Sequence, residues 1–151
     1  MRRKDRETSS EAAFEVVDKC QFAVFSMIDA NGMPYCVPLS IARDGDVIYF
    51  HCAKDGKKKD CLAANPNVCI SCVGNLEALT DKFSVKYESA TIFGKAREIE
   101  ETTEKIHALR ILSERHCAEM MPAFDKEAGA AMSRTGVWRV DIEEISGKAN
   151  T

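Results

Sequence analysis

The chain has 151 residues, the usual size of one domain, and its 45% hydrophobic and 30% charged residues are typical of a globular protein rather than a disordered one. The net charge of -3 argues against a surface built for nucleic acid, and the basic run Arg2-Arg3-Lys4 is followed at once by acids, as in a solvated terminus. No segment approaches the roughly 18 apolar residues of a membrane span, and no apolar core follows the basic start as in a signal peptide. We therefore expect one domain over residues 1–151, located in the cytoplasm, with no nucleic-acid or membrane partner.

The first half of the chain reads as one helix followed by three strands. Residues 10–20 carry a helical pattern, with Phe14, Val17 and Cys20 on one face. Asp29-Ala30-Asn31-Gly32 is a turn, and Asn-Gly is the strongest short hairpin signal. The strands are expected over residues 22–28, 35–42 and 47–52.

The second half alternates short helices with longer strands. Residues 83–99 are strand-like, but a straight strand of that length would exceed roughly 50 Å at about 3.3 Å per residue, so we expect a bend or bulge at Gly94. Residues 101–120 form the clearest helix, with acids at its start. Its apolar stripe is expected to comprise Ile106, Leu109, Leu112 and Met120. The other expected elements are helices over 56–64 and 122–132 and strands over 68–73 and 136–145.

Hairpins dominate this pattern, so the sheet should be mainly antiparallel. A sheet of six strands removes its exposed edges most completely by closing on itself. The sequence therefore predicts a mainly β fold with peripheral helices, built on a six-stranded antiparallel barrel that is closed or nearly closed.

The segment from His51 to Lys59 is the most informative for chemistry. A strand ends there, the chain turns at Gly56, and a helix opens on three lysines. Free N–H groups at a helix start attract an anion, and a lysine adds a full charge, so the segment is a candidate phosphate cradle. It is not a Walker A loop, because the first glycine and the Ser/Thr after Gly-Lys are missing. The alternative is a solvated face of lysines on a short helix.

A second candidate is Val37-Pro38-Leu39-Ser40, where a proline interrupts a strand. Proline lacks the N–H that a ladder needs, so it indicates an edge or a break at which backbone groups are free to bond a ligand ring. A simple edge strand is the alternative.

The cysteines and histidines do not predict a metal site. Seven cysteines show no disulfide-framework spacing, so we expect free thiols. Cys69 and Cys72 lie on an expected strand, where residues three apart point to opposite faces. The side chains of the adjacent pairs His51-Cys52 and His116-Cys117 also point in different directions, so neither pair can bind one metal ion together. No hydrolase motif is present, and Trp138 is expected in the core or an interface.

Several motifs, each loose alone, follow one another in an order that covers almost the whole chain. They are Arg3-Lys4-Asp5-Arg6-Glu7, Pro34-Tyr35-Cys36-Val37-Pro38-Leu39-Ser40, Ile48-Tyr49-Phe50-His51-Cys52-Ala53, Gly56-Lys57-Lys58, Asn65-Pro66-Asn67-Val68, Lys86-Tyr87-Glu88-Ser89-Ala90-Thr91-Ile92-Phe93-Gly94-Lys95-Ala96, Glu104-Lys105 and Ile145-Ser146-Gly147-Lys148-Ala149. With this ordered set the chain resembles the nitroimidazole-resistance branch of the pyridoxamine 5′-phosphate oxidase-like flavin-binding proteins.

The resemblance implies a split β-barrel that forms a homodimer, with flavin mononucleotide (FMN) at the subunit interface. It implies that Lys57 and Lys58 hold the phosphate, with His51, Cys52 and Ala53 beside it, and that Ser89 reaches the phosphate or the ribityl chain. The isoalloxazine edge would lie along Val37, Pro38, Leu39 and Ser40, mainly through backbone. The chain departs from the commonest pattern of the family at Cys52, where Gly is frequent, and at Ala90, where Val is usual. Both residues are small, so cofactor binding should survive.

The function implied is a flavin-dependent reductase of small electron-poor molecules such as nitroimidazoles and other nitroaromatics. No obligatory acid–base residue is evident. His51 is the candidate proton donor, but its favoured role is to buttress the phosphate segment. Three other functions remain open: a pyridoxamine 5′-phosphate oxidase, a haem-binding relative with His107 or His116 as axial ligand, and a flavin-binding protein without catalysis. The sequence does not decide between FMN and FAD.

Overall fold

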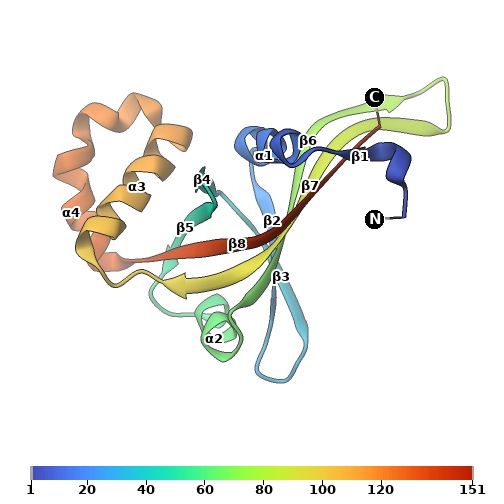
Figure 1. Ribbon diagram of the computed structural model, residues 1–151. Coiled ribbons are helices and arrows are strands. Elements are labelled where there is room, and N and C mark those ends of the chain that lie inside the picture. The colour runs from blue at the N-terminus through green and yellow to red at the C-terminus, as the bar shows by residue number, and fades with distance from the viewer. Residues whose placement is uncertain (1, 151) are drawn as a thin grey trace.

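The structure is a computed structural model that describes residues 2–150, apart from the side chain of Ala131. One antiparallel sheet forms a partly closed barrel, with helices at its ends and on one side (Figure 1). The helices are α1 (Ser10–Lys19), α2 (Lys57–Ala64), α3 (Thr102–His116) and α4 (Phe124–Arg134), with 3-10 turns η1 (Lys4–Arg6) and η2 (Ala118–Ala123). The strands are β1 (Glu7–Thr8), β2 (Ala23–Ile28), β3 (Pro34–Leu39), β4 (Ala42–Asp44), β5 (Val47–Ala53), β6 (Asn67–Leu79), β7 (Ser84–Glu98) and β8 (Thr135–Asn150).

The sheet does not close. Its strand order is β3-β2-β6-β7-β8-β5-β4, with β1 paired to β8, so β3 and β4 lie at the two ends of the path. The single strand expected over residues 35–42 is wrong, because the ladder breaks at Ser40 and Ile41 and the chain passes from one end strand to the other. The split-barrel class is confirmed, with eight strands in place of six. The two extra strands, β1 and β4, are two and three residues long, too short for periodicity to reveal.

Local chemistry explains where several elements begin and turn. The Asp29 carboxylate accepts hydrogen bonds from the N–H groups of Asn31 and Met33, and Gly32 has a φ of 78°, so the β2–β3 hairpin forms where the sequence predicts it. Ser9 caps α1 by accepting from the Ala12 N–H. The Glu101 carboxylate caps α3 by accepting from two N–H groups.

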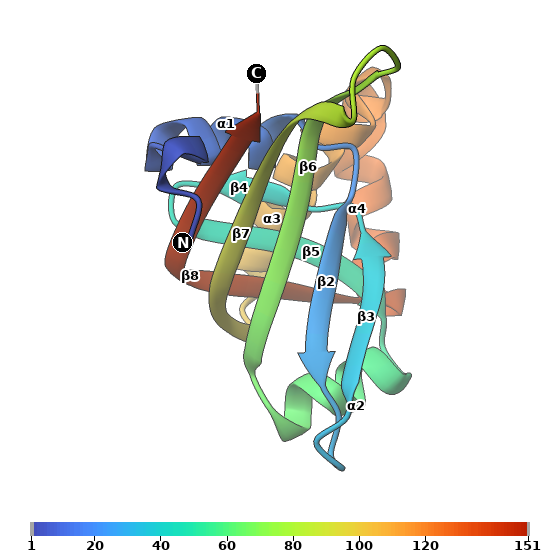
Figure 2. The same cartoon turned by 90° about the vertical axis from the view of Figure 1, so that its right-hand side faces the viewer.

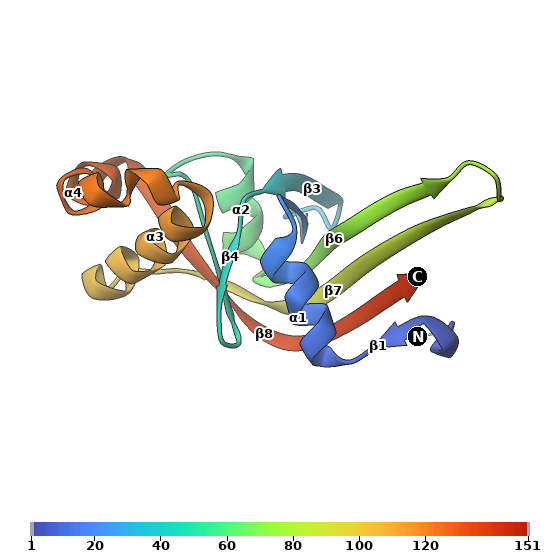
Figure 3. The same ribbon diagram turned by 90° about the horizontal axis from the view of Figure 1, so that it is seen from above.

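Two apolar clusters hold the fold together. Inside the barrel, Phe25 and Phe50 contact each other with ring centroids 4.8 Å apart, and Trp138 stacks on Phe50 at 6.2 Å. Helix α1 covers one end of this cluster (Figure 3). The second cluster lies between the sheet and helices α3 and α4, and it includes Tyr49 and Leu109. Trp138 is 5% exposed, which confirms its place in the core.

The three longest strands, β6, β7 and β8, extend beyond the barrel. The β6–β7 hairpin projects as an arm beside the two termini (Figure 1). Strand β6 therefore runs past the expected end at Val73, because pairing with β7 resumes at Leu76 after an irregularity. The bulge expected at Gly94 is confirmed, since the β7–β8 register shifts between Phe93 and Gly94.

Helix α3 is shorter than expected. It ends at His116, and Met120 lies in η2 with 62% of its surface exposed, so Met120 is not part of the apolar stripe. Leu109 and Leu112 are buried in the second cluster as predicted. None of the helices in residues 2–150 is long and apolar enough to cross a bilayer.

The bulge yields a stability prediction. A methyl group on Gly94 would overlap the Asp141 carbonyl oxygen and approach Val140 Cγ1 at 2.9 Å. Gly94→Ala should therefore lower the free energy of unfolding by about 1–3 kcal/mol, measured by urea denaturation. Gly129→Ala on α4 is the control, because nothing lies within 4 Å of its added methyl group, and it should stabilise by up to about 1 kcal/mol. Similar losses for both variants would contradict the argument.

Candidate functional site

The backbone of the sheet leaves two edges unpaired on either side of its opening. Strand β3 pairs only with β2. Strand β4 covers β5 only over Val47–Tyr49, so residues 50–53 pair with β8 on one side and with no strand on the other. Buried or half-buried backbone groups need partners, so these two edges are where the fold can accept a ligand with donor and acceptor atoms.

Helix α2 begins directly after the open end of β5. Its N-cap is Gly56, which has a φ of 128° and no side chain to accept a hydrogen bond. The first bond of the α2 ladder is donated by Asp60 to the Gly56 carbonyl, so the N–H groups of Lys57, Lys58 and Lys59 have no acceptor within the helix. Helices α1 and α3 have such acceptors in Ser9 and Glu101. The α2 start is therefore suited to an anion.

The three lysines of this helix have different neighbours. Lys57 Nζ lies 4.7 Å from the centroid of the Tyr35 ring and 3.9 Å from an Asp29 carboxylate oxygen. Lys59 pairs with Glu98 at 3.4 Å. Lys58 is half-buried and makes no ion pair with any residue of the described chain. The charge of Lys58 is thus the one at this helix start that no carboxylate neutralises.

On β3, alternation decides what each predicted residue can offer. Val37 and Leu39 are half-buried and pack against the barrel core, while Pro38 is exposed on the opposite face. Pro38 has no N–H to donate to β2, so its pair with Val24 is the non-hydrogen-bonded one and its carbonyl oxygen faces the open edge. The flavin contacts expected along this segment stay a prediction. Ser40 follows the strand and is exposed.

His51 lies at the rim of a cavity of about 350 Å³ between the end of β5 and helix α3. The cavity is lined by Ser40, His51, Leu109, Leu112, Ser113, His116, Cys117 and Thr135. Desolvation, and after it the positive charges of Lys58 and His116, lower the pKa of His51 below its ordinary value of 6.5. Its pKa lies below 6.5, so the imidazole is mainly neutral at pH 7.

Cys52 and Ala53 complete the segment before α2. Burial raises the pKa of the Cys52 thiol, so this residue is not a reactive thiolate. The indole N–H of Trp138 is buried without a hydrogen bond among the described residues, and it approaches Cys52 closely enough to oppose part of that rise. Ala53 is exposed.

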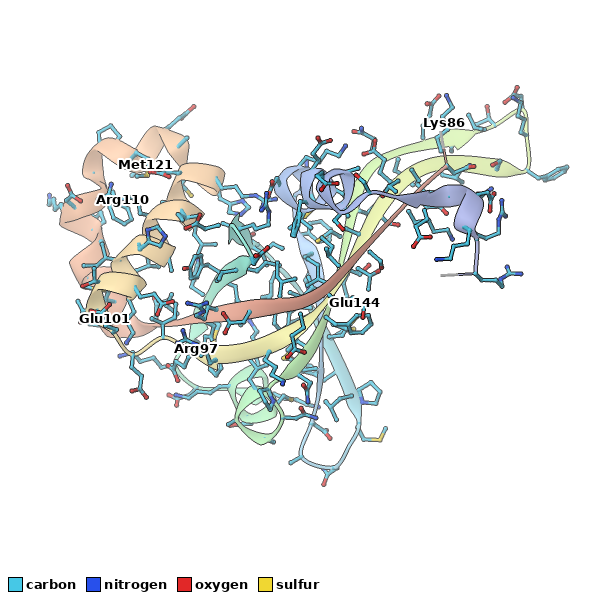
Figure 4. The ribbon with its side chains drawn as sticks, viewed as in Figure 1. Lys86, Arg97, Glu101, Arg110, Met121 and Glu144 are labelled. Carbon is cyan, nitrogen blue, oxygen red and sulfur yellow. The ribbon has the colours of Figure 1, made fainter. Side chains whose placement is uncertain are left out.

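Ser89 is the predicted site residue that the structure does not bring to the others. It lies opposite Val73 and Lys148, and its hydroxyl donates to the Lys148 carbonyl at 3.4 Å. Asn67, just after α2, pairs with Lys95 of β7. Lys95 lies beyond Ser89 on that strand by about 20 Å, at about 3.3 Å per residue. Figure 4 shows this separation, with Lys86 on the arm and Arg97 at the far end of β7. One chain alone therefore cannot place Ser89 beside Lys58.

Sequence reasoning missed the residues that come to the site from elsewhere in the chain. His116 enters the cavity and influences His51, and Asp29 and Tyr35 contact Lys57. No local pattern could reveal a neighbour that lies 65 residues away. The two histidines considered as haem ligands each have a polar partner: His107 Nε2 is 2.9 Å from an Asp44 carboxylate oxygen, and His116 Nε2 is 2.8 Å from the Ile41 carbonyl oxygen.

Comparison with solved structures identifies close matches of the whole fold. A proposed 5-nitroimidazole antibiotic resistance protein from Bacteroides thetaiotaomicron superposes with a TM-score of 0.78 at 26% identity, covering 93% of this chain and 84% of that one. An FAD-binding protein from Mesorhizobium loti gives 0.73 at 23% identity, covering 97% and 98%. An FAD and haem binding protein from Mycobacterium smegmatis gives 0.78 at 20% identity, covering 96% and 73%.

No curated protein sequence matches the chain. The two likenesses below 25% identity establish the fold alone. A family profile described as pyridoxamine 5′-phosphate oxidase matches residues 9–149, which is nearly all of the sequence. The chain therefore belongs to the pyridoxamine 5′-phosphate oxidase family.

Proposed function

We propose that this protein binds FMN between the open edges of β3 and β5 and reduces small electron-poor molecules such as nitroimidazoles and other nitroaromatics. The observation that carries the proposal is the start of α2, where three unbonded N–H groups and the unpaired charge of Lys58 adjoin a free strand edge. The match to a proposed nitroimidazole resistance protein supports the substrate class, and the match to FAD-binding proteins supports a flavin.

The residues present fit such a cofactor. Lys58 and the first turn of α2 would hold the phosphate, with Lys57, His51, Cys52 and Ala53 beside it. The backbone of Val37, Pro38, Leu39 and Ser40 would contact the donor and acceptor edge of the ring. When bound, the flavin supplies the electron transfer, and the protein binds and orients it.

We also propose a homodimer, with the flavin at the subunit interface. The outer face of the sheet carries a contiguous uncharged row formed by Pro38, Val24, Ser71 and Thr91. Figure 2 shows this face, with β2, β3, β6 and β7 in front and β4, β5 and α3 behind. Phe93 and Val73 on the same face are 46% and 51% exposed.

A second copy covering this face would hide apolar surface that water now contacts. By strand alternation Ser89 points to the same face as Thr91 and Phe93. A dimer is thus the arrangement that lets Ser89 of the partner subunit approach a flavin held by Lys58, which one chain alone does not allow.

The cofactor prediction uses the colour and affinity of the protein. The purified or FMN-reconstituted protein should show a flavin spectrum, and Lys58→Met should weaken FMN binding by about 1–3 kcal/mol, roughly five- to 150-fold in Kd. Fluorescence titration of the apoprotein measures this. Lys126→Met, which removes an exposed lysine of α4, is the matched control and should leave Kd unchanged. A Soret band in place of a flavin spectrum would favour haem. Equal Kd values for Lys58→Met and wild type would show that the phosphate does not bind at the start of α2.

The dimer prediction uses a charge placed on the outer face. Phe93 lies opposite Glu144 on β8, so Phe93→Arg can pair with that carboxylate and fold while it puts a charge into the apolar interface. Light scattering at micromolar concentration should find a dimer for wild type and a shift to monomer for the variant. Met120→Arg alters a residue of similar exposure on η2 and should stay dimeric. A wild-type monomer that still binds flavin refutes the dimer.

The last prediction of this subsection concerns His51. Because its pKa is lowered, the imidazole carries little charge above pH ~6.5 and is a poor proton donor there, so we assign it to buttressing the phosphate segment. In His51→Ala, saturated with FMN and reduced chemically without oxygen, the rate of reoxidation by a nitroaromatic should change by less than about tenfold, and FMN affinity should fall. A hundredfold slower rate at full occupancy, with loss of a wild-type pH inflection, would make His51 the proton donor instead.

A further inference from the structure

Two buried cysteines from distant parts of the chain meet at the end of α1. Cys20 is the C-cap residue of that helix, and Cys72 lies on β6, with 3% and 0% of their surfaces exposed. The Cys20 thiol donates to the Val17 carbonyl oxygen at 3.2 Å. Cys72 pairs with Ala23, three residues after Cys20, and both cysteines pack in the barrel cluster. Both are free thiols in the same apolar cluster.

A guanidinium group from another helix lies against this pair. Arg115 of α3 donates through Nη2 to the carbonyl oxygens of Val17 at 2.8 Å and Cys20 at 2.7 Å. The same nitrogen is 3.8 Å from Cys20 Sγ. The backbone contacts fix the cation where it can stabilise a thiolate on Cys20.

The charges around the two sulfurs make them unequal. The Cys72 hydrogen bond, and then Arg115, outweigh burial and the opposing charge of Asp18, and they lower the pKa of Cys20 to about 7. Cys72 retains its proton, because donation to Cys20 and burial both raise its pKa. Of the two sulfurs, Cys20 is therefore the one that loses its proton more readily, and Cys72 is the one that keeps it.

A surface cavity lies directly beside Cys20. It has a volume of about 360 Å³ and is lined by Asp18, Lys19, Cys20, Gln21, Arg115 and His116. Its size admits a peroxide, while Cys72 lies deeper in the barrel.

We propose that Cys20 and Cys72 form an oxidation site for hydrogen peroxide, in which Cys20 reacts first and Cys72 resolves it as a disulfide. The Cys20 sulfur attacks a peroxide oxygen, the O–O bond breaks, and the released hydroxide takes up a proton to become water. The Cys72 sulfur then attacks the resulting Cys20 sulfenic acid, the S–S bond forms, and the S–O bond breaks. Hydroxide leaves with the Cys72 proton as a second water. The two thiols together lose two electrons, and the peroxide gains them.

The test follows oxidation of the full chain by hydrogen peroxide, with alkylation in denaturant and peptide mass spectrometry. The expected first product is a Cys20–Cys72 disulfide, formed before the exposed Cys36 and Cys117 are modified. Cys72→Ser should stop the reaction at a Cys20 sulfenic acid that dimedone traps. Cys69→Ser, which removes a thiol from the opposite face of β6, is the control and should still give the disulfide.

Variants of Arg115 test whether its positive charge activates Cys20 or whether the open cavity alone sets the rate of Cys20 oxidation. Arg115→Gln should slow Cys20 oxidation about fivefold or more, and Arg115→Lys should restore part of the rate, because both leave the cavity open but only lysine keeps the charge. The proposal is overturned if Cys36 or Cys117 oxidises while Cys20 and Cys72 stay alkylatable, or if the folded Cys72→Ser variant gives no trapped adduct at Cys20. Neither readout depends on bound flavin, so the outcome is independent of the function proposed above.

Discussion

The feature on which the rest of this structure depends is a sheet that does not close: its two end strands, β3 and β4, are joined by Ser40 and Ile41 but do not pair with each other. Strand β3 pairs only with β2, and the last residues of β5 pair only with β8, so each keeps one free edge. Exposed strand edges invite pairing with another strand. Pro34 and Pro38 remove two N–H donors from β3, which weakens such pairing and favours a small ligand over a further strand.

Electrostatics at this opening depends on which lysine is neutralised. The chain is acidic overall, and carboxylates of Asp29 and Glu98 lie near Lys57 and Lys59. The proposed anion site therefore combines one lysine charge with the dipoles of the first turn of α2. Lys58 also acts on His51 and, with desolvation, keeps that imidazole from adding a second charge. This arrangement suits a phosphate whose charge is partly spread over backbone donors.

Sequence reasoning succeeded where the determinants are local and failed where they depend on pairing. The Asp29 turn, the proline edge strand and the Gly94 bulge each follow from the chemistry of a few adjacent residues, and all three are present. The division of residues 35–42 at Ser40 and the length of β6 depend on which strand lies alongside, which one sequence does not reveal. The same limit explains Ser89. The sequence shows that Ser89 belongs to a motif, but the distance of Ser89 from α2 is set by the β6–β7 register.

The barrel interior explains why the two proposed reactive sites lie apart. No polar or charged residue is buried in residues 2–150, so proton and charge chemistry is confined to the rim, where Lys58 and His51 lie. Within the barrel cluster the buried ionisable groups are the thiols of Cys20, Cys61 and Cys72. Thiols tolerate this burial because the neutral form is apolar, and Cys20 departs from that state only where Arg115 reaches it from outside the barrel. A cation from α3 thus makes one sulfur reactive in a core that otherwise excludes charge.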